Sequence, residues 1–208
     1  MKVFPLILGP VQTACYLVSN GNKAVVIDPA ANAQTIIRHL KTKGLELEAI
    51  LLTHGHFDHI GAVNELATHY QVPIYAHKKE KEYFENPDVN LSPMIYERLV
   101  LNPNFDYQFL ADGAEFDCID TNIQAFHVPG HTTGSLCFYF KEGDMLFTGD
   151  TLFKGSIGRT DFIYGNHDQL VTGIKKKLLT LPKNTLVYPG HGDCTTIEEE
   201  TNHNPFLK

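Results

Sequence analysis

Four residues able to bind a metal ion occur within six positions of one short segment. They follow the apolar run 49–52 and are His54, His56, Asp58 and His59. A histidine at the end of a buried strand is costly unless a partner holds its ring. Imidazole nitrogens and carboxylate oxygens are typical ligands of divalent transition-metal ions. The segment therefore predicts a metal site where a β-strand ends.

Three later loops also carry a candidate ligand at the end of an expected strand. His131, Asp150 and His191 each follow a glycine, which lets the backbone turn sharply and aim the side chain inward. One such pair alone is common in ordinary turns, but four ligand-bearing loops at successive strand ends are hard to explain as turns. Seven ligands are too many for one tetrahedral ion. They suit two ions about 3.5 Å apart, with one bridging carboxylate.

The composition is that of a globular protein with an acidic surface. The chain has 208 residues, is 43% hydrophobic and has a formal net charge of -7. It can bury a full core, and we expect a single domain over residues 1–208. Nucleic-acid binding needs clustered Lys and Arg, whereas the one basic run, 175–177, is expected on the wet face of a helix. No apolar stretch is long enough to cross a membrane, and residues 1–5 do not resemble a secretion signal. We therefore expect a cytoplasmic protein with neither nucleic acid nor membrane as a partner, and the oligomeric state stays open.

The four cysteines are widely spaced and form no CxxC pair. In a reducing compartment they are expected to be free thiols. Cys15 and Cys137 lie in apolar runs and are expected in the core, and Cys118 has no partner nearby in the sequence. Cys194 lies three residues after His191 and is expected to be a loop residue near the site rather than a ligand or nucleophile.

Apolar periodicity divides the chain into strands and helices. Strands are expected over 13–18, 23–27, 49–52, 73–76, 123–128, 135–140, 145–148 and 185–188, and helices over 33–43, 60–70 and 169–179. The Asn20-Gly21 pair predicts a hairpin between the first two strands. Segment 77–112 is broken by prolines and is expected to be an irregular excursion, with helix over 78–84 and around 94–99, that could serve as a lid. Two sheets with helices outside would fit this order.

The ligand pattern resembles the metallo-β-lactamase superfamily, whose first motif reads HxHxDH. The later His, Asp and His loops of that superfamily match this chain in order, and the resemblance covers the whole chain. It is closest to the glyoxalase II-like branch, through segments 129–132, 149–153, 158–159 and 204–207. The resemblance implies an α+β fold, a four-layer αββα sandwich with the metal site at one edge of the sheets.

The same resemblance divides the seven ligands between two ions. His54, His56 and His131 would hold the first ion, Asp58, His59 and His191 the second, and Asp150 would bridge them. Asp58 and Asp150 are also assigned to catalysis. The ions implied are two divalent cations, with zinc expected and iron or manganese as alternatives.

Two further residues match positions that matter in the superfamily. Asp28 matches an acidic residue at the end of an early strand and is expected to orient the ligand loop, although a simple turn residue is an alternative. Arg159 falls where related enzymes place a basic residue beside the metals and could hold a polar or charged group of the substrate, although a surface arginine fits equally well. His127 is expected to be a packed strand residue. Five further histidines are expected in helices or loops and are not spaced as metal ligands: His39, His69, His77, His167 and His203.

The predicted chemistry is metal-assisted hydrolysis of an acyl compound. Two divalent ions, two aspartates and a bridging hydroxide leave the centre net positive, so it should attract an anionic small molecule. A water between two such ions loses its proton near neutral pH, and the resulting hydroxide is the expected nucleophile. No GxSxG motif supports a serine nucleophile. The glyoxalase II resemblance implies a thioester such as S-lactoylglutathione.

Several alternatives remain open at this stage. A persulfide dioxygenase would use one iron on His54, His131 and Asp150, but its last loop usually reads His-Asp where this chain has His191-Gly192. A lactonase or β-lactamase would use the same nucleophile on another acyl group. A non-enzymatic metal-binding module would close its coordination shell with protein ligands. The seventeen residues after His191 have room for one short helix, so recognition of glutathione is not carried over from glyoxalase II.

Overall fold

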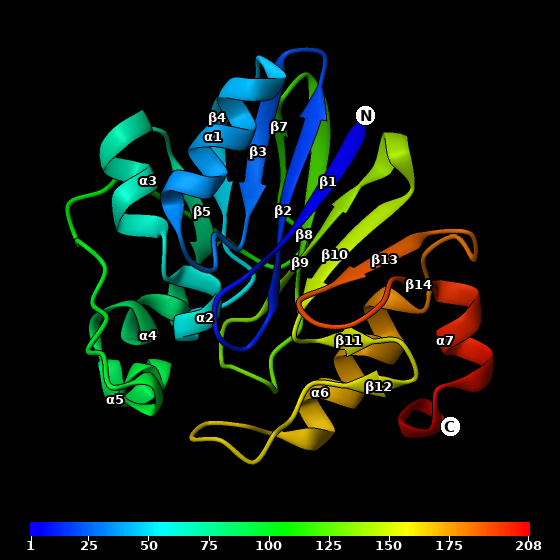
Figure 1. Cartoon of the computed structure of the whole chain (residues 1–208). Helices are drawn as coiled ribbons and strands as arrows, with labels where there is room; N and C mark the ends of the chain where they lie inside the picture. Colours follow the sequence, from blue (N-terminus) through cyan, green and yellow to red (C-terminus); the bar gives the residue numbers. More distant parts are fainter.

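Two six-stranded sheets pack face to face in the computed structural model, which describes all 208 residues (Figure 1). The first sheet contains, in order, β1 (Lys2–Leu8), β2 (Thr13–Asn20), β3 (Lys23–Ile27), β4 (Glu46–Leu51), β5 (Ile74–His77) and β6 (Tyr107–Leu110). The second contains, in order, β14 (Thr195–Thr196), β13 (Leu186–Pro189), β10 (Met145–Gly149), β9 (Leu136–Phe140), β8 (Thr121–His127) and β7 (Glu115–Cys118). A small hairpin of β11 (Leu152–Phe153) and β12 (Ser156–Ile157) lies beside them.

Helices cover the outer face of each sheet (Figure 1). The first sheet is covered by α1 (Ala33–Lys43) and α3 (Val63–Tyr70), and α2 (Phe57–Ile60) lies beyond the end of β4. The second sheet is covered by α6 (His167–Gly173), its π-helical continuation Ile174–Leu178, and α7 (Ile197–His203). The four-layer α+β sandwich that the resemblance implied is therefore confirmed. None of the helices combines the length and the apolar character needed to cross a membrane.

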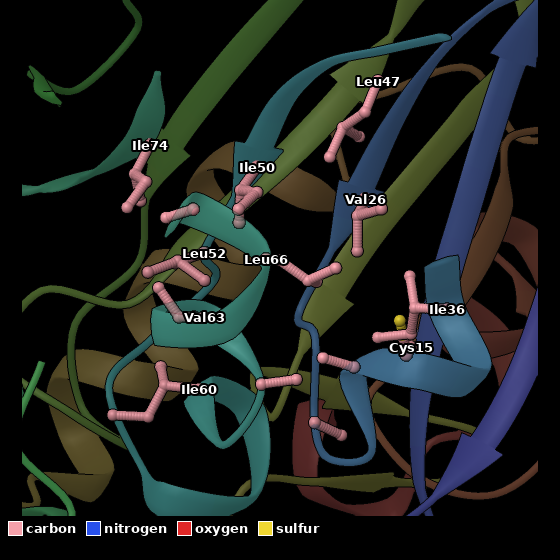
Figure 2. Close-up of a cluster of buried hydrophobic side chains, with 14 of the residues drawn as sticks. Cys15, Val26, Ile36, Leu47, Ile50, Leu52, Ile60, Val63, Leu66 and Ile74 are labelled. Carbon is pink, nitrogen blue, oxygen red and sulfur yellow. The ribbon is translucent and has the colours of Figure 1, made fainter. Parts of the chain in front are cut away.

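Alternating side chains in each strand build three separate cores. In β2, Cys15 (Figure 2) and Leu17 belong to the core under α1 and α3, whereas Tyr16 and Val18 face the second sheet. In β9 the same alternation sends Phe138 into the core between the sheets, while its neighbours face α6 and α7. Because a strand presents successive side chains to opposite faces, each fully buried strand needs partners on both sides.

Two expected helices differ in detail from the structure. Segment 60–70 divides into α2 and α3, because the Ala62 N–H donates to the Pro29 carbonyl at 2.8 Å rather than within a helix. Glycine is needed at position 61, since a Cβ there would collide with the Ala30 carbonyl. Segment 169–179 starts earlier, at His167, and changes to π-helix at Ile174. The hairpin expected at Asn20-Gly21 is confirmed by the pairing of Asn20 with Lys23.

The excursion over 77–112 contains more regular structure than we expected. It holds α4 (Lys81–Glu85), α5 (Pro87–Asn90) and the edge strand β6, which pairs with β5 in parallel. The helix expected around 94–99 is wrong: a short 3-10 turn, Ser92–Ile95, ends at Tyr96, whose φ of 61° is left-handed. Strand β1 was also missed, because its mixed, partly exposed edge position hides the alternation.

The two sheets are joined at the edge that carries the ligand loops. Strands β3 and β4 are parallel, as are β10 and β13, so their carboxyl ends meet there. The Leu136 N–H donates to the Thr53 carbonyl at 2.8 Å, and the Ala14 N–H donates to the Gly190 carbonyl at 2.8 Å. The Tyr16 hydroxyl donates to the Pro189 carbonyl at 2.6 Å. These bonds hold loops from both sheets in one place.

Candidate metal centre

One carboxylate holds the start of the first ligand loop, between β4 and α2. Asp28 accepts the backbone N–H of Thr53 at 2.8 Å and the Thr53 hydroxyl at 2.6 Å. Its Oδ2 also lies 2.8 Å from His59 Nδ1. Asp28 ends β3 with a φ of 49°, a left-handed conformation that few residues besides glycine, Asn and Asp adopt. The strand end thus turns a buried carboxylate toward both ends of the segment that begins at His54.

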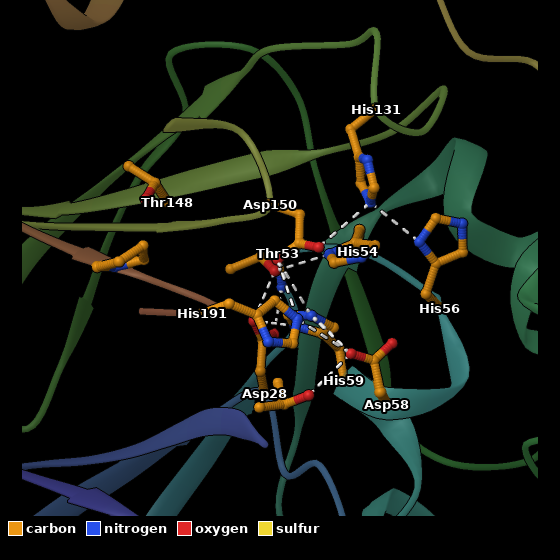
Figure 3. Close-up of polar contacts among 12 residues, drawn as sticks. Asp28, Thr53, His54, His56, Asp58, His59, His131, Thr148, Asp150 and His191 are labelled. Carbon is orange, nitrogen blue, oxygen red and sulfur yellow. Dashed lines mark hydrogen bonds and ion pairs between the residues drawn. The ribbon is translucent and has the colours of Figure 1, made fainter. Parts of the chain in front are cut away.

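Three buried imidazole rings form the first group of the centre (Figure 3). They belong to His54, His56 and His131, and one ring nitrogen of each lies within 4.8 Å of the others. The shortest approach joins His56 Nδ1 to His131 Nε2 at 3.0 Å. His54 Nε2 is buried and has no hydrogen-bond partner, which is rare for a buried polar atom. We call this set the three-histidine group.

Burial keeps the three-histidine group uncharged. It lowers the pKa of His54 well below the ordinary value, and together with the neighbouring His131 it lowers the pKa of His56 to about 3. Burial also lowers the pKa of His131. A neutral imidazole has the free lone pair that a metal ion needs. The group is therefore suited to receive a cation without first losing protons.

A carboxylate and two rings form the second group, which we call the Asp-His-His group: Asp58, His59 and His191. Asp58 Oδ2 lies 3.5 Å from His59 Nε2 and 3.2 Å from His191 Nε2. The Thr13 hydroxyl donates to the same oxygen at 2.8 Å. His59 Nε2 is buried without a hydrogen-bond partner. Asp58 and His59 come from α2, whereas His191 comes from the loop after β13, so the group depends on the tertiary structure.

Charge, more than burial, sets the protonation of the Asp-His-His group. Burial by itself lowers the pKa of His59, but the carboxylates of Asp58 and Asp150 outweigh it and raise that pKa well above the ordinary value. Burial acts on His191 in the same way, and the hydrogen bond with Asp58 raises its pKa. Burial by itself raises the pKa of Asp58, but the neighbouring rings hold it well below its usual range. Without a metal ion, protons therefore take the place of a cation here.

Asp150 lies between the two groups. Its Oδ1 is 3.3 Å from His59 Nε2 and 3.7 Å from His191 Nε2. Its Oδ2 is 3.6 Å from His131 Nε2. The pKa of Asp150 is lowered to about 2, because the nearby histidine rings outweigh the opposing effect of burial. Each oxygen of one ionised carboxylate thus faces a different group of rings.

The side chains present fit a divalent metal ion. His54 Nε2, His59 Nε2 and Asp150 Oδ1 are all buried without a hydrogen-bond partner, and they face the same space. Buried polar atoms are nearly always satisfied, so three such atoms in one cluster indicate a missing positive partner. Five imidazoles and two carboxylates suit zinc, and also iron and manganese.

The far ring nitrogens of two ligands are held by groups that sequence reasoning missed. His131 Nδ1 donates to the Arg159 carbonyl at 2.8 Å, and His54 Nδ1 lies 3.1 Å from the Thr53 hydroxyl. Such bonds orient the ring and leave Nε2 to face a metal ion. The sequence cannot indicate a contact with a backbone carbonyl such as that of Arg159. The hydroxyl residue Thr53 directly before His54, in contrast, could have suggested a partner for the His54 ring.

The glycines that precede the later ligands meet two different needs. Gly130 and Gly149 have φ values of 138° and 48°, so the sharp turn expected from the sequence is present in both loops. Gly190 is needed for space instead. A Cβ there would collide with Asp150 Oδ1 and lie 2.6 Å from His59 Cε1. The third loop can thus approach the centre only because residue 190 has no side chain.

A cleft of about 190 Å³ opens onto the centre. Its walls include the apolar side chains of Leu91, Met94 and Phe162, and its one Lys or Arg is Arg159. The Arg159 guanidinium donates to both oxygens of Asp161 at 2.8 Å and lies 4.0 Å from the centre of the Phe162 ring. Arg159 therefore lines the cleft, and its charge is already paired with Asp161.

The other chemistry-bearing residues lie apart from the seven ligands. His127 is in β8, as expected, and its ring stacks on that of His77 with the ring centroids 3.9 Å apart. Its Nε2 lies 2.9 Å from the Thr133 carbonyl oxygen. His77 ends β5, so its expected place in a helix or loop was wrong. All four cysteines are free thiols, as expected. Cys194 is exposed, whereas Cys15 and Cys137 are buried.

Two curated relatives span nearly the whole chain. The probable metallo-hydrolase YqgX of Bacillus subtilis is 40% identical over 212 residues, covering 100% of this chain and 98% of the relative. The hydroxyacylglutathione hydrolase GloC of Haemophilus influenzae is 39% identical over 204 residues, covering 94% of this chain and 93% of the relative.

Solved structures with the same fold include a metallo-beta-lactamase, a di-iron-bound protein and ETHE1. The BLEG-1 B3 metallo-beta-lactamase has a TM-score of 0.94 at 40% identity, with 100% of both chains covered. TTHA1623, solved in a di-iron-bound form, has a TM-score of 0.87 at 39% identity, covering 99% of this chain and 100% of the other. ETHE1 from Myxococcus xanthus has a TM-score of 0.79 at 31% identity, covering 99% and 84%. Residues 8–191 match the metallo-beta-lactamase superfamily, and with its His/Asp cluster of metal-binding type the chain belongs to that superfamily of metallo-hydrolases.

Proposed function

We propose that this member of the superfamily is a binuclear metallohydrolase that cleaves acyl thioesters. The three-histidine group would hold one ion and the Asp-His-His group the other, with Asp150 shared between them. When bound, two divalent ions would polarise the substrate carbonyl and lower the pKa of a water between them, so that hydroxide is available near neutral pH. Zinc is the metal we propose, with iron or manganese as alternatives. The di-iron-bound form of the similar protein TTHA1623 supports iron as an alternative.

The position of Asp150 is the observation that carries this proposal. One of its oxygens faces His59 and His191, and the other faces His131. A carboxylate that served a single ion would not need a second complete group of ligands behind it. The spacing therefore favours a shared ligand and two ions over a mononuclear site.

The work of the chain itself is to orient groups around the reacting carbonyl. We assign Asp58 and Asp150 to catalysis because both residues line the cleft that opens onto the ligand groups. There they can accept a hydrogen bond from the attacking water and align it. The Thr13 hydroxyl holds Asp58 at 2.8 Å, so this carboxylate does not have to reorganise during the reaction. A thiolate is a good leaving group, so no separate general acid is required.

The choice of a thioester rests on similarity and on the cleft. GloC, a hydroxyacylglutathione hydrolase, is 39% identical over nearly the whole chain. The apolar walls at Met94 and Phe162 can accept an acyl chain, and Arg159 is the candidate for a substrate carboxylate or hydroxyl. A 2-hydroxyacyl thioester similar to S-lactoylglutathione is the substrate we propose.

A cyclic acyl substrate, a lactone or a β-lactam, is the second candidate. The BLEG-1 B3 metallo-beta-lactamase matches this chain over its full length at 40% identity, which favours acyl hydrolysis in general. Oxidation of a thiol persulfide on one iron remains a weaker alternative. It would use His54, His131 and Asp150 and leave the Asp-His-His group without a function.

The proposal is tested by purifying the protein anaerobically, quantifying bound metals, and assaying one substrate of each class at equal metal content. We expect about two ions per chain and the highest kcat/KM for S-lactoylglutathione among that thioester, a homoserine lactone and a penicillin. Oxygen uptake with glutathione persulfide, without thioester cleavage, would replace the hydrolase with an oxygenase. A single ion at saturation would contradict the binuclear site.

A further inference from the structure

Glu80 is a buried carboxylate that the proposed reaction does not use. It ends a short 3-10 turn, Lys78–Glu80, and is preceded and followed by lysines. Its surface is completely buried, although such a sequence is typical of an exposed helix face. A buried carboxylate is costly unless hydrogen bonds satisfy it. The partners of Glu80 therefore indicate why it is there.

Three donors from two separate ligand loops converge on Glu80. The Gly55 N–H donates to its Oε2 at 2.6 Å. The Gly134 N–H and the Thr132 hydroxyl both donate to its Oε1 at 2.7 Å. Gly55 lies between His54 and His56, and Thr132 directly follows His131. Glu80 thus bonds to a sequence neighbour of every member of the three-histidine group, from a segment that contributes no ligand.

Two glycines make this close contact sterically possible. A Cβ at Gly134 would lie 2.6 Å from Glu80 Oε1. A Cβ at Gly55 would lie 3.1 Å from Glu80 Oε2 and 2.5 Å from the Cβ of Tyr83. Neither glycine has a left-handed φ, so the backbone conformation does not require glycine at either position. The space beside the carboxylate requires it.

We propose that Glu80 is a positioning residue that sets the relative placement of the three-histidine group. Glu80 would hold that group in place by hydrogen bonds, as Asp28 holds Thr53 and His59. His56 and His131 come from different sheets, and their nitrogens lie only 3.0 Å apart. Glu80 joins their two loops directly. The proposal concerns the metal centre alone and holds whichever acyl group the protein cleaves.

The variant Glu80→Gln tests this role with little change in volume. A carboxamide has one acceptor oxygen and one donor NH₂, so it must oppose at least one of the N–H donors of Gly55 and Gly134. We expect zinc affinity, measured by chelator competition, to fall about 10–100-fold, the usual cost of losing an outer partner of a metal ligand. The visible absorption bands of the cobalt-substituted protein should shift, because they report ligand geometry. Far-ultraviolet circular dichroism should stay unchanged.

Glu200 provides a matched control, because its donors are neither ligands nor sequence neighbours of a ligand. It is also fully buried and accepts three donors: the Gly155 N–H at 2.9 Å, the Thr195 hydroxyl at 2.6 Å and the Asn204 amide at 2.7 Å. Glu200→Gln should lower the melting temperature while leaving zinc affinity and the cobalt spectrum unchanged. If both variants lost zinc affinity equally, the effect would be general destabilisation and the proposal would fail.

Thr132→Val covers the case in which Glu80→Gln does not fold. It removes one of the three hydrogen bonds to Glu80, together with the contact between the Thr132 and Ser135 hydroxyls, at nearly constant volume. We expect a smaller shift of the cobalt spectrum in the same direction. An unchanged spectrum and zinc affinity in Thr132→Val, or in a folded Glu80→Gln, would overturn the proposal. Loss of thioester cleavage with an intact cobalt spectrum would instead bear on the proposed function.

Discussion

The Nδ1 atom of His56 lies 3.0 Å from the Nε2 atom of His131, and burial lowers the pKa of both rings. One proton between two neutral rings at this distance makes an N–H···N hydrogen bond, and the same two rings belong to a set able to hold a metal ion. The residues are 75 positions apart and come from different sheets, so the contact depends on how the sheets are joined.

Replacing the shared carboxylate should affect both ions. We expect Asp150→Ala to bind at most one metal ion per chain and to lose more than about 100-fold in hydrolysis, beyond the usual cost of an outer partner. Elemental analysis and steady-state kinetics on the same sample measure both effects. Full metal content with full activity in this variant would remove Asp150 from its proposed place between the ions.

Removing Asp28 should have a smaller effect. Asp28→Ala takes away the partner of His59 Nδ1 and two bonds to Thr53, but no ligand atom. We expect metal affinity to fall about 10–100-fold, with two ions still bound at saturation. His127→Ala is the control, because His127 lies outside both ligand groups, and its metal stoichiometry should match the unmodified protein. A stoichiometry below two in His127→Ala would mean that the ligand set is incomplete.

Metal uptake should release protons and weaken in acid. The pKa of His59 and of His191 is raised in the metal-free protein, because neighbouring carboxylates outweigh burial, so an ion must displace protons there. Affinity should therefore rise with pH through the folded-state pKa values. The raised pKa of His59 also stabilises the metal-free fold below the ordinary value of 6.5, and that contribution is lost as pH rises through the folded pKa.

Calorimetry in two buffers with different ionisation enthalpies measures this proton release directly. We expect net release near neutral pH. The three-histidine group should contribute little of it, because burial already keeps those rings neutral. Identical heats in both buffers would contradict protonation of the Asp-His-His group.

Arg159 should matter for substrate binding rather than for metal content. We expect Arg159→Ala to raise KM about tenfold or more for a carboxylate-bearing thioester, in line with ~1.5–3 kcal/mol for a hydrogen bond to a charged group. An uncharged thioester of similar size should show little change. The His131 contact uses the backbone carbonyl of residue 159, so metal content should be preserved. A fall in metal content or an equal loss on both substrates would rule out a specific role in binding.

Asp161→Asn complements that experiment. Asp161 accepts hydrogen bonds from Nε and Nη2 of Arg159, but the pair is exposed, and exposed pairs contribute little stability. Freeing the guanidinium should lower KM for the carboxylate-bearing thioester while leaving kcat nearly unchanged. An unchanged KM would mean that the substrate does not reach Arg159.

Much of the fold could be predicted from local patterns. Apolar runs at strand spacing located most central strands, and the glycine after Asn20 located the first hairpin. These signals are local because a buried strand or a two-residue turn constrains its own residues. Edge strand β1 and the division between α2 and α3 were missed, because exposure at an edge and the hydrogen bond from Ala62 to Pro29 depend on distant parts of the chain.

The sequence by itself determined which side chains can serve as ligands and where along the strands they stand, since both follow from residue type and neighbouring residues. Only the tertiary structure decided how those side chains lie around Asp150, because His131 and His59 meet it from different elements. It also decided the place of Glu80, which the flanking lysines would assign to the surface. Its burial depends on Gly55 and Gly134, 25 and 54 positions away, and no local pattern carries contacts of that range.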